Sequence, residues 1–306
     1  MRSSEPLRPL AVVGPTASGK SSLALGLAER VSSVELVSVD SMQVYRGMDV
    51  GTAKPTPGEQ AAVPHHMIDV LDPHEECSVA WFAEQARAVS RDLATRGRTK
   101  VLVGGTGLYH RAVVDDLDIP GQFPEVAAEL ESEPDPAVLH RRLTVLDPIA
   151  AGRIDPGNRR RLLRALEVTI GSGRPFSSSG AGLETYPATD VAFVGLDVDR
   201  GTLTERIERR LDRQMEEGFL DEVARLDARP DGWSRTAAQA LGYRELLDVV
   251  HGCADLSTRL EEIRLRTRRF AVRQVRWYLR DPRIRWFEAT SPELRDDVLE
   301  YWGSAK

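Results

Sequence analysis

The chain has 306 residues, 41% of them hydrophobic, and a formal net charge of −6, which allows one large domain or two smaller ones around a sizeable core. No apolar run approaches the roughly 18 residues of a membrane span, and Met1–Leu10 lacks the apolar stretch of a secretory signal. The two isolated cysteines, Cys77 and Cys253, form neither a disulfide framework nor a zinc site. These features together predict a cytoplasmic protein.

The first part of the chain alternates between predicted strands and helices. Short apolar, β-branched runs predict buried strands at residues 9–13, 34–39, 100–103 and 191–198. Helices are predicted at residues 19–30 and 79–96, the second with Ser78 as its N-cap. Strands that alternate with helices favour a parallel sheet covered on both faces, so the expected fold class is α/β.

The segment between the third and fourth predicted strands has a different pattern. It contains helical stretches and no convincing strand, at residues 124–131, 137–146 and 159–169. A Gly- and Ser-rich loop follows at residues 171–182. We interpret residues 118–189 as a helical insertion domain, and residues 1–117 with 190–306 as an α/β core that carries C-terminal helices.

A phosphate-binding loop follows the first predicted strand. The segment GPTASGKS matches G-x-x-x-x-G-K-[ST] at every fixed position, with a strand before it and a helix after it. Its glycines let backbone N–H groups point at phosphate oxygens, and the helix N-terminus adds a positive dipole end. Lys20 would neutralise the phosphates, and the Ser21 hydroxyl would hold Mg²⁺. The predicted diphosphate-binding residues are Gly14, Pro15, Thr16, Ala17, Ser18, Gly19, Lys20 and Ser21.

Polar residues after the next two strands indicate a chemistry other than nucleotide hydrolysis. The sequence has no guanine-recognition N-K-x-D segment and no strongly apolar strand that ends in an Asp-Glu pair. Asp40 ends the second predicted strand, and Gly104–Tyr109 follows the third, so both should face the crevice at the carboxyl ends of the strands. The alternative role for Asp40 is a helix N-cap or a hydrogen bond to a group that itself binds Mg²⁺, and a tight turn is the alternative for the glycines.

Two further features concern partners. Ten arginines stand against three acidic residues between Arg259 and Arg285, a basic stripe of the kind that RNA-binding enzymes carry. Five of these arginines recur at helical spacing, and they either bind phosphates or pack on the core with their stems: Arg266, Arg269, Arg273, Arg276 and Arg280. The adjacent His65 and His66 point opposite ways in an extended segment, which favours a hydrogen-bonded histidine over a metal pair.

Several segments together resemble one family. GPTASGKS, DSMQVYRGMDVGTAKP, PHHMIDV and GGTGLY stand in the order and spacing of the tRNA isopentenyltransferase (IPP transferase) family, the tRNA dimethylallyltransferases. The resemblance continues through DPIAAGRIDPGNRRRLLRALEV, RIERRLDRQMEEGFLDEV, ALGYREL and TRRFAVRQVRWYLR, and covers about residues 9–286. This combination is far more specific than the phosphate-binding loop alone.

The resemblance implies a function and a cofactor. Enzymes of this family transfer a dimethylallyl group from dimethylallyl diphosphate to N6 of the adenosine 3′ of the anticodon, in tRNAs that read codons beginning with U. Their fold is a P-loop NTPase-like parallel sheet core with a helical insertion domain that grips the anticodon stem-loop. The resemblance gives catalytic roles to Asp40, Lys20 and Thr106, with Asp40 as the base for N6, and places Mg²⁺ at Ser21.

The resemblance also implies a tRNA-binding set and partners. The expected tRNA-binding residues are Asp40, Ser41, Met42, Gln43, Thr106, Arg160, Arg161, Arg164, Gly242, Tyr243 and Arg244. The expected partners are the tRNA anticodon stem-loop and dimethylallyl diphosphate, with no membrane, and the expected state is a monomer. Two other hypotheses stay open: a P-loop kinase for a small metabolite, with Asp40 as its base, and a nucleotide-gated RNA-binding protein without transferase activity.

Overall fold

The computed structural model describes residues 7–179, 183 and 185–304. Two predicted features lie partly outside the described residues. They are residues 1–6 of the N-terminal segment without a secretory signal, and residues 180–182 of the Gly- and Ser-rich loop. The chain forms two compact units. One comprises the residues up to Val114 and from Ala188 onward, and the other is Asp115–Pro187.

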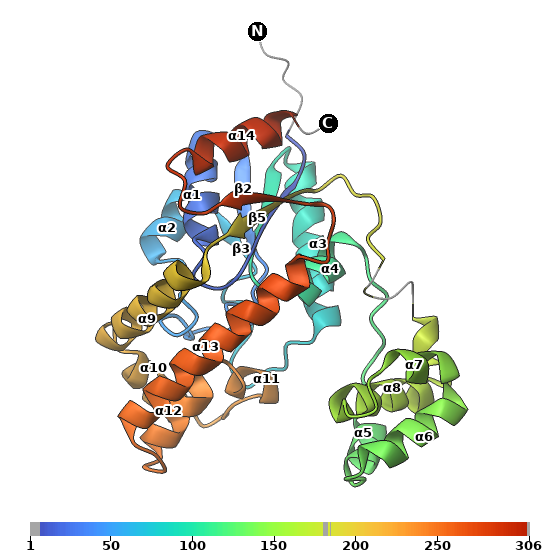
Figure 1. Ribbon diagram of the computed structural model, residues 1–306. Coiled ribbons are helices and arrows are strands. Elements are labelled where there is room, and N and C mark those ends of the chain that lie inside the picture. The colour runs from blue at the N-terminus through green and yellow to red at the C-terminus, as the bar shows by residue number, and fades with distance from the viewer. Residues whose placement is uncertain (1–6, 180–182, 184, 305–306) are drawn as a thin grey trace. The chain divides into compact units, whose positions relative to one another are not determined.

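The larger unit contains a six-stranded sheet in which every neighbouring pair is parallel (Figure 1). The strand order is β3-β2-β4-β1-β5-β6. The strands are β1 Leu10–Val13, β2 Val34–Ser38, β3 His65–His66, β4 Thr99–Val103, β5 Ala192–Asp197 and β6 Ile284–Glu288. The predicted α/β class with a parallel sheet is confirmed. The sequence pattern predicts the four inner strands and misses β3 and β6, which form the two edges of the sheet.

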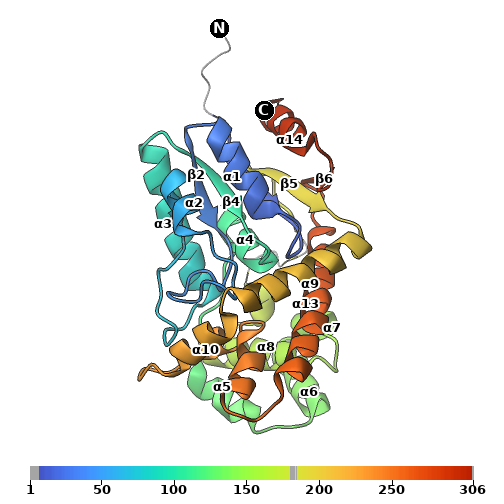
Figure 2. The same cartoon turned by 90° about the vertical axis from the view of Figure 1, so that its left-hand side faces the viewer.

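Helices cover both faces of this sheet and extend beyond it. They are α1 Lys20–Arg30, α2 Pro57–Ala62, α3 Val79–Thr95, α4 Gly107–Val114, α9 Arg200–Glu216, α10 Phe219–Asp227, α11 Arg235–Ala238, α12 Tyr243–Val250, α13 Leu256–Tyr278 and α14 Leu294–Ser304. Helix α1 packs on α14 on one side of the sheet, whereas α3 covers the other side (Figure 1). Helices α9 and α13 contact one another beyond the end of α1 that carries Lys20 (Figure 2).

The main core lies between α1, α14 and the sheet. Alternate residues of β1, Leu10 and Val12, point into it and meet Leu27 of α1 and Trp302 of α14, all of them fully or almost fully buried. The indole N–H of Trp302 donates to the carbonyl oxygen of Arg8 at 2.8 Å, so the last helix is fixed to the start of β1. This packing holds β1, and with it the loop that follows β1, in one position.

The smaller unit is helical. It consists of α5 Pro124–Glu131, α6 Pro136–Leu146, α7 Pro148–Arg153, α8 Arg159–Ser172 and the 3₁₀ segment η1 Phe176–Ser178, around a core of leucines and alanines. Asn158 caps α8, which runs to Ser172 and ends at Gly173 with φ 68°. Within the described part of the chain, no helix is both long and apolar enough to span a bilayer.

Candidate active site

The predicted phosphate-binding loop joins β1 to α1. Gly14 and Gly19 have φ angles of 144° and 96°, a region that favours glycine, and Ala17 also adopts a positive φ of 61°. Gly19 is the N-cap of α1, which begins without a side-chain cap. The first N–H groups of the helix therefore have no competing side-chain acceptor. A glycine-bounded loop before such a helix is the arrangement that binds phosphate groups.

Lys20 reaches back under the loop, where its Nζ donates to the carbonyl oxygen of Pro15 at 2.6 Å. Loss of water around the ammonium group lowers the pKa of Lys20 to about 7. The Asp40 carboxylate opposes this shift, and the Arg210 guanidinium adds to it. The side chain of Lys20 is thus close to the point at which it loses its charge near neutral pH.

Helix α9 supplies two arginines to the loop, and neither of them is among the site residues predicted from the sequence. Arg210 Nη1 donates to the Thr16 hydroxyl at 3.2 Å, and Arg206 Nη1 donates to the carbonyl oxygen of Ser18 at 3.3 Å. Burial lowers the pKa of Arg210 from its usual value. The i, i+4 spacing places both side chains on one face of α9, but only the tertiary fold reveals that this face meets the loop.

Two cavities meet at the phosphate-binding loop. The larger, of about 940 Å³, is lined by the loop and by the cationic side chains of Lys20, Arg206, Arg209, Arg210 and Arg213. The second, of about 520 Å³, has an apolar wall of Ile207, Leu211, Phe219, Ile263 and Phe270, and we call it the apolar cavity for that wall. Its lining also includes Thr106 and the side chains of Arg210, Arg266, Arg269 and Arg273. Thr16, Asp40 and Arg210 line both cavities. A cationic cavity joined to an apolar one suits a ligand with a diphosphate head and a short hydrocarbon tail.

Asp40 lies two residues beyond the end of β2, where the two cavities join. Its Oδ1 accepts a hydrogen bond from the backbone N–H of Met42 at 2.9 Å, which begins a tight turn. Its second carboxylate oxygen has no hydrogen-bond partner among the described residues. One oxygen thus holds the turn, and the other is available to a ligand.

The segment after Asp40 is held by its own polar side chains. The Ser38 hydroxyl donates to Oε1 of Gln43 at 2.8 Å, and Nε2 of Gln43 donates to the carbonyl oxygens of Thr52 and Ala53 at 3.3 and 3.2 Å. Both ends of the Gln43 amide are therefore engaged within the protein. Of the four consecutive residues expected to contact tRNA here, Gln43 has the clearest structural role.

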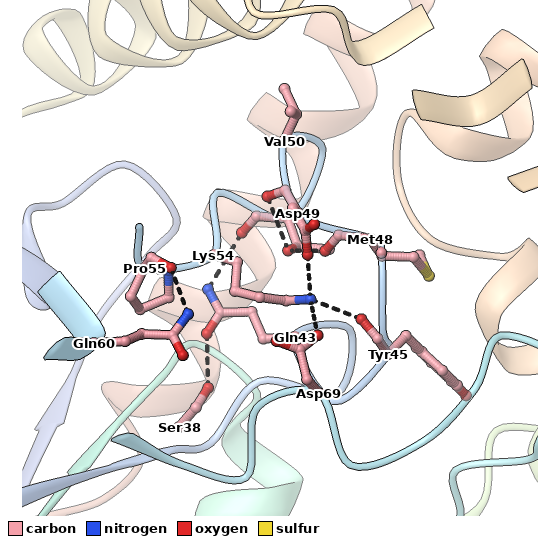
Figure 3. A network of polar contacts seen from close by, with 12 residues as sticks. Ser38, Gln43, Tyr45, Met48, Asp49, Val50, Lys54, Pro55, Gln60 and Asp69 are labelled. Carbon is pink, nitrogen blue, oxygen red and sulfur yellow. Dashed lines mark hydrogen bonds and ion pairs between the residues drawn. The ribbon is translucent and has the colours of Figure 1, made fainter. Parts of the chain in front are cut away.

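A buried lysine connects the end of this segment to its surroundings (Figure 3). The Lys54 side chain is 2% exposed, and its Nζ donates to the carbonyl oxygen of Tyr45 at 2.7 Å and to carboxylate oxygens of Asp49 and Asp69 at 2.6 Å each. Asp69 has a φ of 54°, a left-handed conformation that few non-glycine residues adopt without support. Lys54 thus ties the segment 45–54 to the strained turn at residue 69.

Helices α9, α10 and α12 hold the same segment from the other side. The Glu222 carboxylate accepts hydrogen bonds from the N–H groups of three successive residues, 49–51, at 2.8–3.1 Å, and from the Tyr243 hydroxyl at 2.6 Å. Nε2 of Gln214 donates to the carbonyl oxygens of residues 50 and 51 at 2.6 and 3.0 Å. Tyr243 is 0% exposed, so its side chain supports the site from inside and offers no surface to RNA in this conformation.

The segment Gly104–Thr106 follows β4 and approaches α13. A Cβ atom on Gly105 would lie 2.2 Å from Nε2 of Gln274, and one on Gly107 would lie 2.1 Å from the Trp277 ring. Gly105 and Gly107 therefore make room for α13, while Gly104 and Gly105 also line the larger cavity. The carbonyl oxygen of Thr106 accepts hydrogen bonds from the first turn of α4, and Thr106 lines the apolar cavity.

The arginines expected to bind tRNA have different environments. In the smaller unit, Arg160 and Arg161 are exposed and have no partner among the described residues. Arg164 instead donates to the carbonyl oxygens of residues 120 and 121 and pairs with Glu167 at 2.8 Å. In the larger unit, Gly242 is buried and Arg244 is exposed. Two of the predicted arginines in the smaller unit are thus unpaired, and the third has a structural role.

Helix α13 and the turn that follows it carry a second group of unpaired arginines. Four exposed arginines recur at intervals of four, three and four residues and have no acidic partner in the described part of the chain: Arg269, Arg273, Arg276 and Arg280. Arg269 and Arg273 line the apolar cavity. This spacing places the first three on one face of α13, and Arg280 stands two residues after the helix ends at Tyr278. We call these four residues the α13 arginine stripe.

The two adjacent histidines contact different groups. His65 Nδ1 lies 2.7 Å from the carbonyl oxygen of Val63, and His66 Nε2 lies 2.7 Å from the Glu35 carboxylate. Hydrogen bonds from Arg96, His66 and Arg98 lower the pKa of Glu35 to about 2. The described residues include no group of three or more His, Cys, Asp or Glu side chains that could hold a metal ion.

Comparison with known proteins shows the family. A family model described as IPP transferase matches residues 43–281, and one described as isopentenyl transferase matches residues 8–69. The chain belongs to the IPP transferase family. The phosphate-binding loop and Asp40 lie in the part matched by the second model, and α9 and α13 lie in the part matched by the first.

Individual members of the IPP transferase family match nearly the whole chain. A Kineococcus radiotolerans protein named tRNA dimethylallyltransferase is 48% identical over 288 residues, which are 92% of this chain and 90% of the relative. A Streptomyces avermitilis protein of the same name is 46% identical over 293 residues, 94% and 93% of the two chains.

Solved structures of the same family share the fold. A tRNA isopentenylpyrophosphate transferase from Bacillus halodurans is 37% identical, with a TM-score of 0.70 and coverage of 97% of this chain and 94% of that chain. A eukaryotic dimethylallyltransferase described as acting on tRNA is 26% identical, with a TM-score of 0.76 and coverage of 97% and 76%.

Proposed function

We propose that this protein transfers a dimethylallyl group from dimethylallyl diphosphate to N6 of the adenosine 3′ of the anticodon, in tRNAs that read codons beginning with U, and releases diphosphate. The observation that carries this proposal is the junction of a cationic cavity and an apolar cavity at Thr16, Asp40 and Arg210. The close relatives named tRNA dimethylallyltransferase support it. The cytoplasmic location and the monomeric state stay predictions.

The donor diphosphate lies in the phosphate-binding loop. Breaking the allylic C–O bond leaves negative charge on diphosphate, and the loop N–H groups, Lys20 and Arg210 stabilise that charge as it develops. Ser21 is exposed in the first turn of α1 and presents a hydroxyl oxygen, a donor type that Mg²⁺ accepts together with phosphate oxygens and water. These residues fit a Mg²⁺ ion held by Ser21 and the donor, and the ion would add positive charge at the leaving group.

The hydrocarbon tail of the donor enters the apolar cavity, and the acceptor adenine lies next to it, beside Asp40 and Thr106, which line the same cavity. Its exocyclic amine is a weak nucleophile because the nitrogen lone pair is delocalised into the ring. The free carboxylate oxygen of Asp40 takes the N6 proton as the new C–N bond forms. Thr106 contacts the base, and the adenine leaves its stack to reach this position, at a cost of about a few kcal/mol that is smallest in a single-stranded loop.

The test is a transfer assay with purified protein, Mg²⁺, radiolabelled dimethylallyl diphosphate and unmodified tRNA. Label on the adenosine 3′ of the anticodon would establish both the donor and the acceptor. Absence of label, together with ATP turnover, would contradict the proposal and favour a kinase or a nucleotide-gated RNA-binding protein.

Donor binding should take up a proton above pH 7. The pKa of Lys20 is about 7, so Lys20 is largely neutral above that pH, whereas bound diphosphate favours its charged form. Affinity for inorganic diphosphate should fall up to tenfold per pH unit above 7. Calorimetric titrations at pH 8 in buffers of different ionisation enthalpy measure the proton count, and Lys20→Met corrects for protonation of the ligand itself. Equal proton counts for the two proteins would contradict the prediction.

We propose that the α13 arginine stripe binds RNA phosphates, as do Arg160 and Arg161 in the smaller unit. Replacing Arg276 and Arg280 with glutamine should weaken tRNA binding and lower the slope of log Kd against log salt by about 2. Arg264→Gln is the matched control, because Arg264 lies on the same helix but pairs with Asp212 and Glu261. A slope that is unchanged in the double variant would remove the stripe from the RNA interface.

A further inference from the structure

One buried side chain connects the donor loop to the segment that carries Thr106. Gln274 of α13 is 6% exposed. Its Oε1 accepts a hydrogen bond from the backbone N–H of Thr16 at 2.8 Å, and its Nε2 donates to the carbonyl oxygen of Gly105 at 2.9 Å. These partners lie 258 and 169 residues away in the sequence. Thr16 lies in the phosphate-binding loop, and Gly105 directly precedes Thr106.

The two hydrogen bonds require the chemistry of a primary amide. A glutamine side chain presents one acceptor and one donor at its end, matching the free N–H on one loop and the free carbonyl on the other. An ionised glutamate offers acceptors only, and a leucine of similar size offers neither. Each loop group would be unsatisfied without this amide, because both bonds are part-buried or buried.

The surrounding residues are shaped to admit this amide. A Cβ atom on Gly105 would lie 2.2 Å from Nε2 of Gln274, so any larger residue at position 105 would displace the amide. The same Cβ position is 3.6 Å from the carbonyl oxygen of Gly14, so the two loops are near neighbours. The bridge therefore sets a distance between segments that are already close but not bonded to each other.

We infer that Gln274 is a positioning residue, which fixes the distance between the diphosphate of the donor and the base that Thr106 contacts. This inference rests on the function proposed above. Transfer requires the acceptor nitrogen to approach the donor carbon to roughly 3–3.5 Å, and a misplacement of about 1 Å can lower the rate about 10²-fold. Gln274 does not itself touch the reacting atoms.

Loss of this alignment has a chemical signature. If the amine is displaced, water can attack the same allylic carbon. The C–O bond to diphosphate breaks, the water oxygen bonds to that carbon, and the water proton passes to solvent. The products are then dimethylallyl alcohol and diphosphate in place of modified tRNA. The ratio of alcohol to transferred label therefore reports alignment, whereas general loss of folded protein lowers both products equally.

The experiment measures both products for the native protein, Gln274→Leu and Gln274→Glu, with labelled donor, Mg²⁺ and unmodified tRNA. We expect transfer by Gln274→Leu to fall about 10²-fold and the alcohol-to-transfer ratio to rise at least tenfold. Affinity for inorganic diphosphate should change less than about threefold, because Lys20, Arg206 and Arg210 remain. Val298→Ala, a core change in α14 that touches neither loop, controls for loss of stability.

Gln274→Glu adds a pH test. A protonated carboxyl group has one donor and one acceptor, like the amide, so lowering the pH should bring the product ratio of this variant toward the native value, while Gln274→Leu stays high at the same pH. A ratio that stays native in all variants, or rises equally in Val298→Ala, would overturn the positioning role. Native protein that transfers no label would instead overturn the proposed function, and the inference with it.

Discussion

Replacing Asp40 with asparagine is expected to lower the rate of dimethylallyl transfer about 10²–10⁴-fold, the range of a lost general base, while tRNA affinity stays close to native. Asp40 lines both cavities, and its Oδ1 accepts the N–H of Met42. Asparagine keeps that acceptor, so the turn should persist. It lacks the second carboxylate oxygen, the one with no partner among the described residues, and so it cannot take the N6 proton.

Single-turnover transfer and tRNA binding should be measured on the same Asp40→Asn preparation. Asp212→Asn is the matched control, because Asp212 is a carboxylate of α9 that pairs with Arg264 on the exposed surface. Asp40→Ala should lose transfer equally and should also weaken the turn. Transfer by Asp40→Asn within about threefold of native would exclude Asp40 as the base.

The parts of the site that local sequence predicts are those built from contiguous residues. The phosphate-binding loop needs a strand, two glycines and a helix start within about a dozen residues, and all of these appear in the sequence and in the structure. Asp40 was found for a similar reason, since the end of a buried parallel strand is visible as the end of an apolar run. The role of each residue at these positions stays a proposal.

The parts that sequence reasoning missed depend on long-range packing. Arg206 and Arg210 reach the loop from a helix nearly 200 residues away, and helical spacing alone does not say what a helix face meets. Tyr243 belongs to a segment expected to lie along tRNA, yet it is fully buried beside Glu222. A motif can show that a residue is important, but it does not show whether the side chain contacts a ligand or supports the protein from inside.

The two edge strands were missed for physical reasons. β3 has only two residues, His65 and His66, and is too short to show a period of two. β6 reads IRWFE, and its charged residues are typical of an edge strand that must avoid pairing with other chains. It also follows a long arginine-rich helix, and its charged residues continue the composition of that helix in the sequence. Short or polar edge strands show a weaker hydrophobic pattern in the sequence than the buried strands between them.

The Lys54 network should give a stability difference that depends on which charge is left without a partner. Lys54 is 2% exposed, whereas Asp49 and Asp69 are 54% and 40% exposed. Lys54→Met leaves two carboxylates that water can still reach, so we expect a loss of about 3 kcal/mol in the free energy of unfolding, the low end for a broken buried pair. Replacing both Asp49 and Asp69 with asparagine leaves the buried ammonium without an anion, and should cost more, up to about 5 kcal/mol.

Urea unfolding of the two variants measures this order, with Asp72→Asn, whose partners Arg46 and Arg229 are surface residues, as the control. Asparagine tolerates the φ of 54° at position 69, so backbone strain alone should not explain a large loss. If Lys54→Met loses as much free energy of unfolding as the double variant, the hydrogen bonds of Lys54 to the two segments carry the stability, and the burial of an unpaired charge does not. The same variants should raise the KM for tRNA more than the KM for dimethylallyl diphosphate. The reason is that Lys54 holds the segment that follows Asp40 and does not contact the phosphate-binding loop.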